Sequence, residues 1–200
     1  MIRLAVIDSG VANIGSVCYA LERLGVAPTL VRSAAELEQA ERALLPGVGS
    51  AGAAMTRLRE LDLIDAIRRF PRPLFGICLG MQLLFERSAE GDVEGLGLIP
   101  ERVEKLRESA GVRVPHMGWN RLNKRIDSPL LEGIAEGAQA YFVHSFAAPV
   151  GDYTLASSAH GDAFSALVRR GNIAGAQFHP ERSAAVGARL LQNFLEWNGQ

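Results

Sequence analysis

The stretch PLFGICLG, residues 73–80, reads as a buried strand that turns sharply into a helix. We expect the strand to cover Pro73–Cys78 and the helix to cover Leu79–Arg87. Glycines stand two residues before and two residues after Cys78, and neighbours without a Cβ atom allow a tight strand-to-helix turn to close. Such a turn would strain the backbone of Cys78 and present its thiol at the carboxyl end of a sheet.

The first half of the chain alternates strand and helix patterns around this stretch. Apolar runs predict strands, and apolar residues at helical spacing predict helices between them. This order favours right-handed βαβ units and therefore an α/β fold, a three-layer, mostly parallel, doubly wound sheet of the flavodoxin-like type. The expected strands are Ile2–Asp8, Thr29–Arg32 and Arg42–Leu45, and the expected helices are Asn13–Leu24, a short helix opened by Ser33, and Met55–Phe70.

Additional antiparallel strands are expected in the second half, where the glycine and asparagine at 171–172 predict a hairpin turn. We expect a single domain over residues 1–200, because no linker, repeat or low-complexity tract interrupts the chain. The expected segments are β ribbons at Gly95–Arg107 and Val112–Ile126, a short helix at Ser128–Ile134, strands at Gln139–Ala147, Thr154–Ser158, Ala163–Arg170 and Ile173–Phe178, and a last helix from Ser183.

Composition excludes several classes of function. The chain has 200 residues and a formal net charge of −1, which argues against a nucleic-acid partner. It contains no apolar run of about 20 residues and begins without a signal-peptide pattern, so we expect no membrane association and a cytoplasmic location. The two cysteines, Cys18 and Cys78, form no disulfide framework and lack metal-site spacing, so we expect no metal ion. We expect no cofactor either.

A second strand end carries QFHPE, residues 177–181. A catalytic thiol needs an imidazole base, and the imidazole needs an acceptor that fixes its tautomer. Residues i and i+2 of an extended segment point to the same side, so Glu181 can reach the ring of His179, and Pro180 favours that geometry. Read separately, Cys78 could be a core cysteine and His179 a surface histidine. Read together, they predict a Cys78–His179–Glu181 triad.

The residues PGVG, 46–49, follow the third expected strand and lie beside the strand that ends at Cys78. An oxyanion in acyl transfer needs two hydrogen-bond donors. We expect the N–H of Leu79 to supply one, at a helix N-terminus whose dipole also favours the thiolate. We expect main chain at Val48 and Gly49 to supply the other, although this segment could also be a plain turn.

Three further histidines, His116, His144 and His160, lack a carboxylate at a similar spacing. We therefore expect them to be structural or to lie next to the substrate. Cys18 falls on the apolar stripe of its expected helix, which argues against a second cysteine–histidine pair.

Several motifs resemble the triad, or class I, glutamine amidotransferases: GICLGMQ at 76–82, PGVGS at 46–50 and HPE at 179–181. Their order along the chain matches that family as well. Within it, NIGS at 13–16 and PHMGWN at 115–120 resemble the glutaminase subunits of imidazole glycerol phosphate synthases. The resemblance covers essentially the whole chain. A glutaminase releases ammonia from glutamine, and the resemblance would leave no second domain in this chain to use that ammonia.

The resemblance implies that Cys78 attacks the carboxamide of glutamine while His179 transfers protons and Glu181 orients His179. Glutamate and ammonia would form through a glutamyl thioester. It also implies a set of glutamine-binding positions, which are Gln82, Glu90, Ser145 and Phe146. By itself Glu90 reads as a solvated carboxylate, and the family often has tyrosine where Phe146 stands.

By the same resemblance, ammonia would pass to a cyclase subunit with a (β/α)8 barrel fold, in a heterodimer. That partner would make imidazole glycerol phosphate and aminoimidazole carboxamide ribotide in histidine biosynthesis. Positions facing it correspond to Asn13, Trp119, Tyr141 and Arg182, although Trp119 could be a core aromatic and Arg182 a solvated side chain. The alternatives are the glutaminase of another synthase, such as pyridoxal phosphate synthase, a thiol hydrolase for γ-glutamyl peptides, and a non-catalytic flavodoxin-like binding module.

Overall fold

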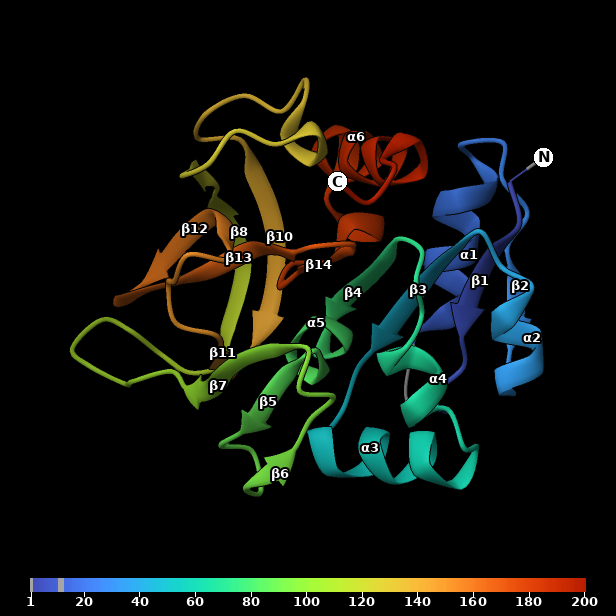
Figure 1. Ribbon diagram of the computed structural model, residues 1–200. Helices are drawn as coiled ribbons and strands as arrows, with labels where there is room; N and C mark the ends of the chain where they lie inside the picture. Colours follow the sequence, from blue (N-terminus) through green and yellow to red (C-terminus); the bar gives the residue numbers. More distant parts are fainter. Residues whose placement is uncertain (1, 11–12) are drawn as a thin grey trace.

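A computed structural model describes residues 2–10 and 13–200, and it confirms the α/β fold class (Figure 1). An eight-stranded sheet runs in the order β2-β1-β3-β4-β14-β13-β12-β9. From β2 to β14 the neighbours pair in parallel, and from β14 to β9 they pair antiparallel. The bounds are β1 Leu4–Ile7, β2 Thr29–Val31, β3 Arg42–Gly47, β4 Leu74–Cys78, β9 Asn123–Lys124, β12 Thr154–His160, β13 Asp162–Arg170 and β14 Ile173–Ala176.

Helices cover both faces of the parallel strands, which gives the expected three layers. Alternate residues of β1 point to opposite faces, so Leu4 and Val6 join one core cluster and Ala5 and Ile7 join another. The first cluster includes residues of α1 and α6, and the second includes residues of α2, α3, α4 and α5. In Figure 1, α6 lies above the sheet and α3 below it. The bounds are α1 Ile14–Glu22, α2 Ala34–Glu38, α3 Ala51–Glu60, α4 Ile64–Arg68, α5 Leu79–Leu83 and α6 Ala184–Glu196.

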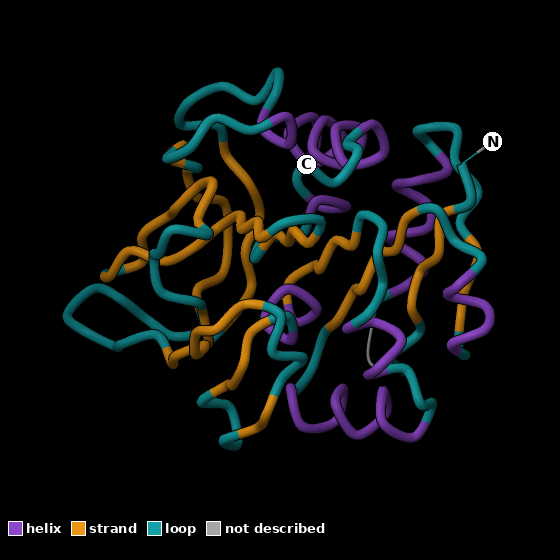
Figure 2. The backbone as a smooth tube through the Cα atoms, viewed as in Figure 1, coloured by secondary structure: helices purple, strands orange, loops and turns teal. Residues whose placement is uncertain are grey.

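Strands and loops make up nearly all of the second half before α6 (Figure 2). The hairpin between β13 and β14 turns at Gly171, whose φ of +58° suits glycine. Two smaller sheets stand beside the large one, a pair of β10 with β8 and a sheet in the order β11-β7-β5-β6. Their bounds are β5 Phe85–Ser88, β6 Val93–Glu94, β7 Ile99–Lys105, β8 His116–Arg121, β10 Gln139–His144 and β11 Phe146–Ala147, with a short 3-10 helix at Pro129–Leu131.

The helix expected over Leu79–Arg87 is wrong in its second half. Helix α5 ends at Leu83, and the chain continues directly into β5, which pairs in parallel with β7. Phe85 is fully buried there and packs edge-to-face on Tyr153, with ring centroids 5.4 Å apart. A short apolar run fits a buried strand as well as a helix, and here packing against a distant aromatic ring decides between them.

The single helix expected over Met55–Phe70 is two helices. Helix α3 begins earlier, at Ala51, where the hydroxyl of Ser50 accepts a hydrogen bond from the N–H of Ala53. Asp62 then adopts a φ of +54°, which ends the first helical segment and redirects the chain into α4. Aspartate is one of the few residues that tolerates this left-handed conformation, so the apolar spacing continues across a break in the helix.

Candidate active site

The site lies where three neighbouring parallel strands end. Gly47 at the end of β3 lies opposite Cys78 at the end of β4, and Ala176 of β14 lies opposite Ile77 on the other side. Carboxyl ends of parallel strands in an α/β sheet form the usual binding crevice. This register brings the PGVG, GICLG and QFHPE segments to one edge.

Cys78 occupies the sharp turn that its glycine neighbours predict. Its φ of +53° lies in the left-handed region, and α5 begins at the next residue. A Cβ atom on Gly76 would lie 2.6 Å from the N and Cα atoms of Met81, so only glycine fits two residues before the cysteine. Helix α5 has just five residues, so its dipole contributes less to the thiolate than a long helix would.

Main-chain and side-chain groups hold the thiol in place. Cys78 is 7% exposed, and its Sγ donates to the carbonyl oxygen of Val143 at 3.9 Å. The Nε2 of Gln177 donates to the same Sγ at 3.8 Å. We did not anticipate either contact from the sequence. Gln177 stands two residues before His179, and the i, i+2 argument that places Glu181 beside His179 could also have drawn attention to it.

His179 and Glu181 form the expected pair. The Nδ1 of His179 lies 2.8 Å from Oε1 of Glu181, and both side chains are buried. His179 keeps the extended backbone predicted before Pro180, with φ of −97° and ψ of 99°. Within the described residues, His179 Nε2 makes no hydrogen bond. The free nitrogen is therefore the one available to exchange a proton with a nearby group.

The surroundings of His179 favour its protonated form. Burial alone would lower its pKa, but the neighbouring thiol of Cys78 and the carboxylate of Glu181 outweigh burial and raise the pKa to about 10. His179 is therefore a strong acceptor for the proton of the Cys78 thiol.

Helix α6 and β10 fix the main chain of His179. The hydroxyl of Ser183 donates to the His179 carbonyl oxygen at 2.7 Å and accepts from the N–H of Tyr141 at 2.9 Å. The His179 N–H donates to the carbonyl oxygen of Tyr141 at 2.9 Å. Gly187 lets the helix approach, because a Cβ atom there would lie 1.8 Å from the Pro180 carbonyl oxygen.

A cavity of about 360 Å³ opens over the thiol and gathers most of the expected site residues. Its volume suits a small polar molecule. The lining residues are Asn13, Val48, Gly49, Cys78, Leu79, Gln82, Glu90, Pro115, Val143, His144, Ser145, Phe146, His179, Glu181 and Arg182. Trp119 and Tyr141 do not line it.

The segment expected to form the oxyanion site is exposed at this cavity. Val48 and Gly49 both line it, and Gly49 has a φ of +86°. Their strand is held upstream, where the carbonyl oxygen of Pro46 accepts from the hydroxyl of Ser9 at 3.5 Å. Leu79 is the first residue of α5, so its N–H is one of those that a helix leaves without an internal partner.

Gln82 holds another wall of the cavity. Its Nε2 donates to the carbonyl oxygen of Phe146 at 2.8 Å and to Oε1 of Gln177 at 3.0 Å. Both amide hydrogens of Gln82 are therefore committed to the protein. Gln82 orders the Ser145–Phe146 main chain beside the cavity, and its carbonyl oxygen is the part left to face a ligand.

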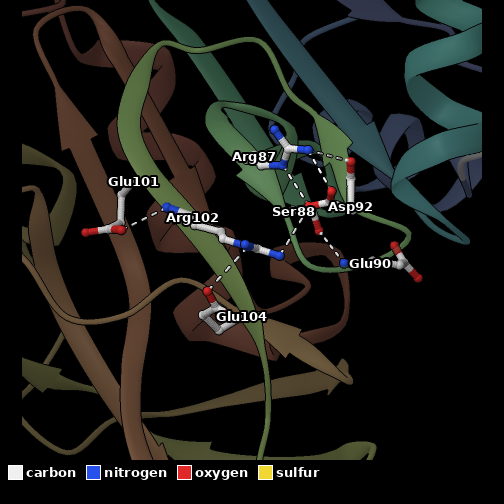
Figure 3. A network of polar contacts seen from close by, with 7 residues as sticks. All are labelled: Arg87, Ser88, Glu90, Asp92, Glu101, Arg102 and Glu104. Carbon is white, nitrogen blue, oxygen red and sulfur yellow. Dashed lines mark hydrogen bonds and ion pairs between the residues drawn. The ribbon is translucent and has the colours of Figure 1, made fainter.

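Glu90 stands in the turn between β5 and β6 (Figure 3). Arg87 binds both carboxylate oxygens of Asp92 at 2.7 Å, and Arg102 contacts Asp92 at 3.3 Å, so ion pairs brace this turn. The side chain of Glu90 points away from these arginines, and its Oε2 accepts from the N–H of Ala51 at 2.7 Å. Glu90 is therefore a cap of α3 at the rim of the cavity, and not simply a solvated carboxylate.

Three of the four residues expected to face a partner, Trp119, Tyr141 and Arg182, pack in a row beside the cavity. Trp119 is 51% exposed and meets Tyr141 edge-to-face, with ring centroids 6.0 Å apart. The guanidinium of Arg182 stacks 5.3 Å from the centre of the Tyr141 ring. Asn13 caps α1, where its side-chain oxygen accepts from the N–H of Ser16 at 3.4 Å. Trp119 is thus no core aromatic.

Residues 2–10 and 13–200 include no helix long and apolar enough to cross a membrane. In the same described ranges, no group of three or more His, Cys, Asp or Glu side chains is arranged to hold a metal ion.

Comparison with known proteins identifies the family. The model of the class-I glutamine amidotransferases matches residues 5–197, so the chain belongs to that family. Relatives from Xanthomonas axonopodis pv. citri (strain 306) and Xylella fastidiosa (strain Temecula1) are each 58% identical over 196 residues, covering 98% of both chains. Both relatives are named imidazole glycerol phosphate synthase subunit HisH. These similarities confirm the resemblance that the motifs indicated.

Solved structures agree on the fold. A crystal structure described as glutamine amidotransferase superposes with a TM-score of 0.76 at 25% identity and covers 96% of this chain and 97% of that one. The structure of PurLQS from Thermotoga maritima has a TM-score of 0.71 at 23% identity, covering 98% and 99% of the two chains.

Proposed function

We propose that this chain hydrolyses glutamine to glutamate and ammonia with a Cys78–His179–Glu181 triad. The proposal rests on one cavity whose wall contains both Cys78, in its strained strand-to-helix turn, and the buried pair of His179 and Glu181. The Nδ1 of His179 lies 2.8 Å from Oε1 of Glu181. Membership of the class-I glutamine amidotransferases supports the same chemistry. We treat residues 1–200 as one domain that carries this activity.

In the first step, the sulfur of Cys78 forms a bond to the carboxamide carbon of glutamine. The thiol proton moves to Nε2 of His179, the nitrogen without another partner. Glu181 holds the opposite ring nitrogen and stabilises the imidazolium. Main-chain N–H groups of Leu79 and of the Val48–Gly49 segment stabilise the oxyanion.

Collapse of the tetrahedral intermediate breaks the C–N bond, and His179 gives its proton to the departing ammonia. The raised pKa of about 10 keeps His179 protonated until this donation. Water then attacks the thioester with His179 as base, which releases glutamate and restores the thiol. Glu90, Gln82 and the main chain at Ser145 and Phe146 hold the substrate, since all four positions line the same cavity.

We further propose that the ammonia passes to a cyclase subunit of (β/α)8 barrel fold, in a heterodimeric imidazole glycerol phosphate synthase. The names of the relatives that are 58% identical support this assignment within histidine biosynthesis. The docking surface is formed by exposed Trp119 and the half-buried Tyr141 that it packs on, with Arg182 and Asn13 at the cavity rim.

The triad is tested by replacing each of the two cysteines in turn. Cys78→Ala abolishes glutamine hydrolysis and labelling by a diazo-ketone analogue of glutamine, while the fold and partner binding persist. Cys18→Ala is the matched control, because Cys18 lies in α1 outside the cavity, and it retains activity. Substantial hydrolysis by the Cys78→Ala variant would contradict the assignment of the nucleophile.

The isolated chain is proposed to be nearly inactive until a ligand-loaded partner binds. The Gly47–Gly49 peptide supports this idea, since Val48 and Gly49 are exposed and flexible glycines flank Val48. Glutaminase assays with and without the cyclase subunit test the idea. Equal turnover by the free chain and the complex would contradict it.

A further inference from the structure

Two buried histidines next to the cavity have no part in the triad. His144 is the last residue of β10 and lies directly opposite His116, the first residue of β8. They are 6% and 4% exposed. Buried imidazoles need hydrogen-bond partners for both ring nitrogens, and these two are partners of each other.

An unbroken chain of hydrogen bonds runs through them to the cavity wall. The His144 Nδ1 lies 2.9 Å from the carbonyl oxygen of Phe146, the same oxygen that accepts from Gln82. The His116 Nδ1 lies 3.0 Å from His144 Nε2, and the Asn120 Nδ2 lies 3.2 Å from His116 Nε2. Asn120 Nδ2 also donates to the carbonyl oxygen of Ala159 at 2.8 Å.

Every donor in this chain is determined by its two ends. A carbonyl oxygen only accepts, so His144 donates from Nδ1 to Phe146. At the other end, Asn120 Nδ2 donates to Ala159 while its side-chain oxygen accepts from the N–H of Arg121, which establishes the amide orientation independently. Both ends therefore require that each neutral histidine carries its proton on Nδ1 and accepts at Nε2.

The surroundings keep both rings neutral. Burial lowers the pKa of His116 to about 4 and that of His144 to about 3, with smaller contributions from neighbouring histidines. His116 stacks on the ring of Phe142 at 5.0 Å and on His160 at 4.3 Å. A neutral imidazole has one N–H. Neither ring can therefore move its proton from Nδ1 to Nε2 without losing one of these hydrogen bonds.

The end of the hydrogen-bond chain at Asn120 lies on strand β8, which is exposed on one face. Side chains of β8 alternate between faces, so His116 and Asn120 point inward while Met117 and Trp119, 65% and 51% exposed, point outward. The near end lies on the cavity wall. The N–H of Leu106, the residue after β7, donates to the Ser145 carbonyl oxygen and holds Ser145. Phe146 presents its own carbonyl oxygen to Gln82 and His144.

We propose that His144 and His116 are positioning residues for glutamine binding, which orient the Phe146 main chain from strand β8 through a chain of fixed tautomers. This inference rests on the proposed glutaminase function. Neither histidine transfers a proton to the substrate. Each acts through the Phe146 carbonyl oxygen, and a displacement of β8 reaches the glutamine site by this route.

The first test compares two substitutions of His116 in a Cys18→Ala background, measured with the cyclase subunit present. Asparagine can place an N–H where His116 Nδ1 stands, whereas phenylalanine keeps the ring shape and removes the donor. H116F leaves Nε2 of His144 buried without its hydrogen-bond donor. The KM for glutamine therefore rises about tenfold, which matches the usual cost of an unpaired buried acceptor. H116N retains a KM close to that of the parent.

A second readout separates positioning from general damage. Iodoacetamide alkylates Cys78, but it lacks the amino and carboxylate groups by which the cavity would recognise glutamine. We therefore expect the rate of alkylation to be the same in H116F and in the parent. The inference is overturned if H116F has the parental KM, if H116N is impaired as much as H116F, or if alkylation slows in step with the loss of glutamine affinity.

The tautomers supply a test that does not depend on activity. Two-bond 1H–15N spectra of the unsubstituted chain with labelled histidine report which ring nitrogen carries the proton. Both His116 and His144 are expected to be protonated at Nδ1 and bare at Nε2 near neutral pH. An Nε2-protonated pattern for either ring overturns the inference even where glutaminase activity is normal. If the unsubstituted chain has the expected spectra but no glutaminase activity with the cyclase subunit, the proposed function is contradicted and the assigned tautomers are not.

Discussion

Gly80 in α5 lies directly against the main chain of Leu45 in β3, because a Cβ atom on Gly80 would stand 1.7 Å from the Leu45 carbonyl oxygen. This contact joins the two segments on which the proposed chemistry depends. Gly80 follows the thiol by two residues, and Leu45 leads into the PGVG segment. Contact between main-chain atoms therefore sets the spacing between the turn at Cys78 and the part of β3 that leads into the oxyanion segment.

Gly80→Ala should separate these two segments. The added methyl group overlaps main-chain atoms of β3, so we expect a loss of about 3 kcal/mol in unfolding free energy and loss of glutaminase activity. Gly15→Ala is the control, because a Cβ atom there meets nothing within 4 Å. It should leave stability unchanged or raise it by up to about 1 kcal/mol. Denaturant melts of both variants decide the matter, and equal stabilities would contradict the prediction.

Ser183→Ala should weaken the hold on the triad histidine. The substitution leaves the Tyr141 N–H without its acceptor. It also removes one of the two hydrogen bonds that the His179 carbonyl oxygen accepts, and only the bond from the Arg182 N–H remains. We expect a cost of about 1–3 kcal/mol in stability together with a lower kcat for glutamine. Ser128→Ala, which removes only the cap of a distant 3-10 helix, should keep full activity. Normal kcat in Ser183→Ala would show that β10 alone positions His179.

Trp119→Ala should weaken the complex with the cyclase subunit. Exposed tryptophan at an interface is a frequent binding hot spot, so we expect a loss of about 2 kcal/mol in binding free energy. Leu30→Ala is the control, because Leu30 is exposed on β2 at the opposite end of the large sheet. Titration calorimetry with the cyclase subunit compares them. Similar affinities for both variants would place the interface elsewhere.

Local patterns predicted the parts of the site that depend on neighbours in the chain. The glycine spacing around Cys78 follows from steric limits of one turn, and the reach of Glu181 to His179 follows from strand geometry. The alternation of apolar runs predicted the parallel strands equally well. In each case the residues that decide the structure lie within a few positions of one another.

Contacts between distant segments escaped prediction for the same reason. Gln177 reaches Cys78 across 99 positions, and His116 reaches His144 across 28. The change from helix to strand after Leu83 depends on Tyr153, which packs on Phe85 from the far part of the chain. A pattern read along one segment contains no information on such partners, which only the sheet register brings together.

Mild acid should destabilise the fold through the two buried histidines. In the folded chain the pKa of His116 is about 4 and that of His144 about 3, both below the ordinary value of 6.5. Between these values and 6.5, the unfolded chain binds more protons than the folded chain. Stability is therefore complete above about pH 6.5 and falls as the pH drops toward about 4. His116→Asn removes one of these groups and should lose less stability between about pH 7 and about pH 5, by roughly 1–2 kcal/mol. Urea melts at both pH values measure the difference, and equal losses in the parent and the variant would mean that His116 is protonated in the folded state.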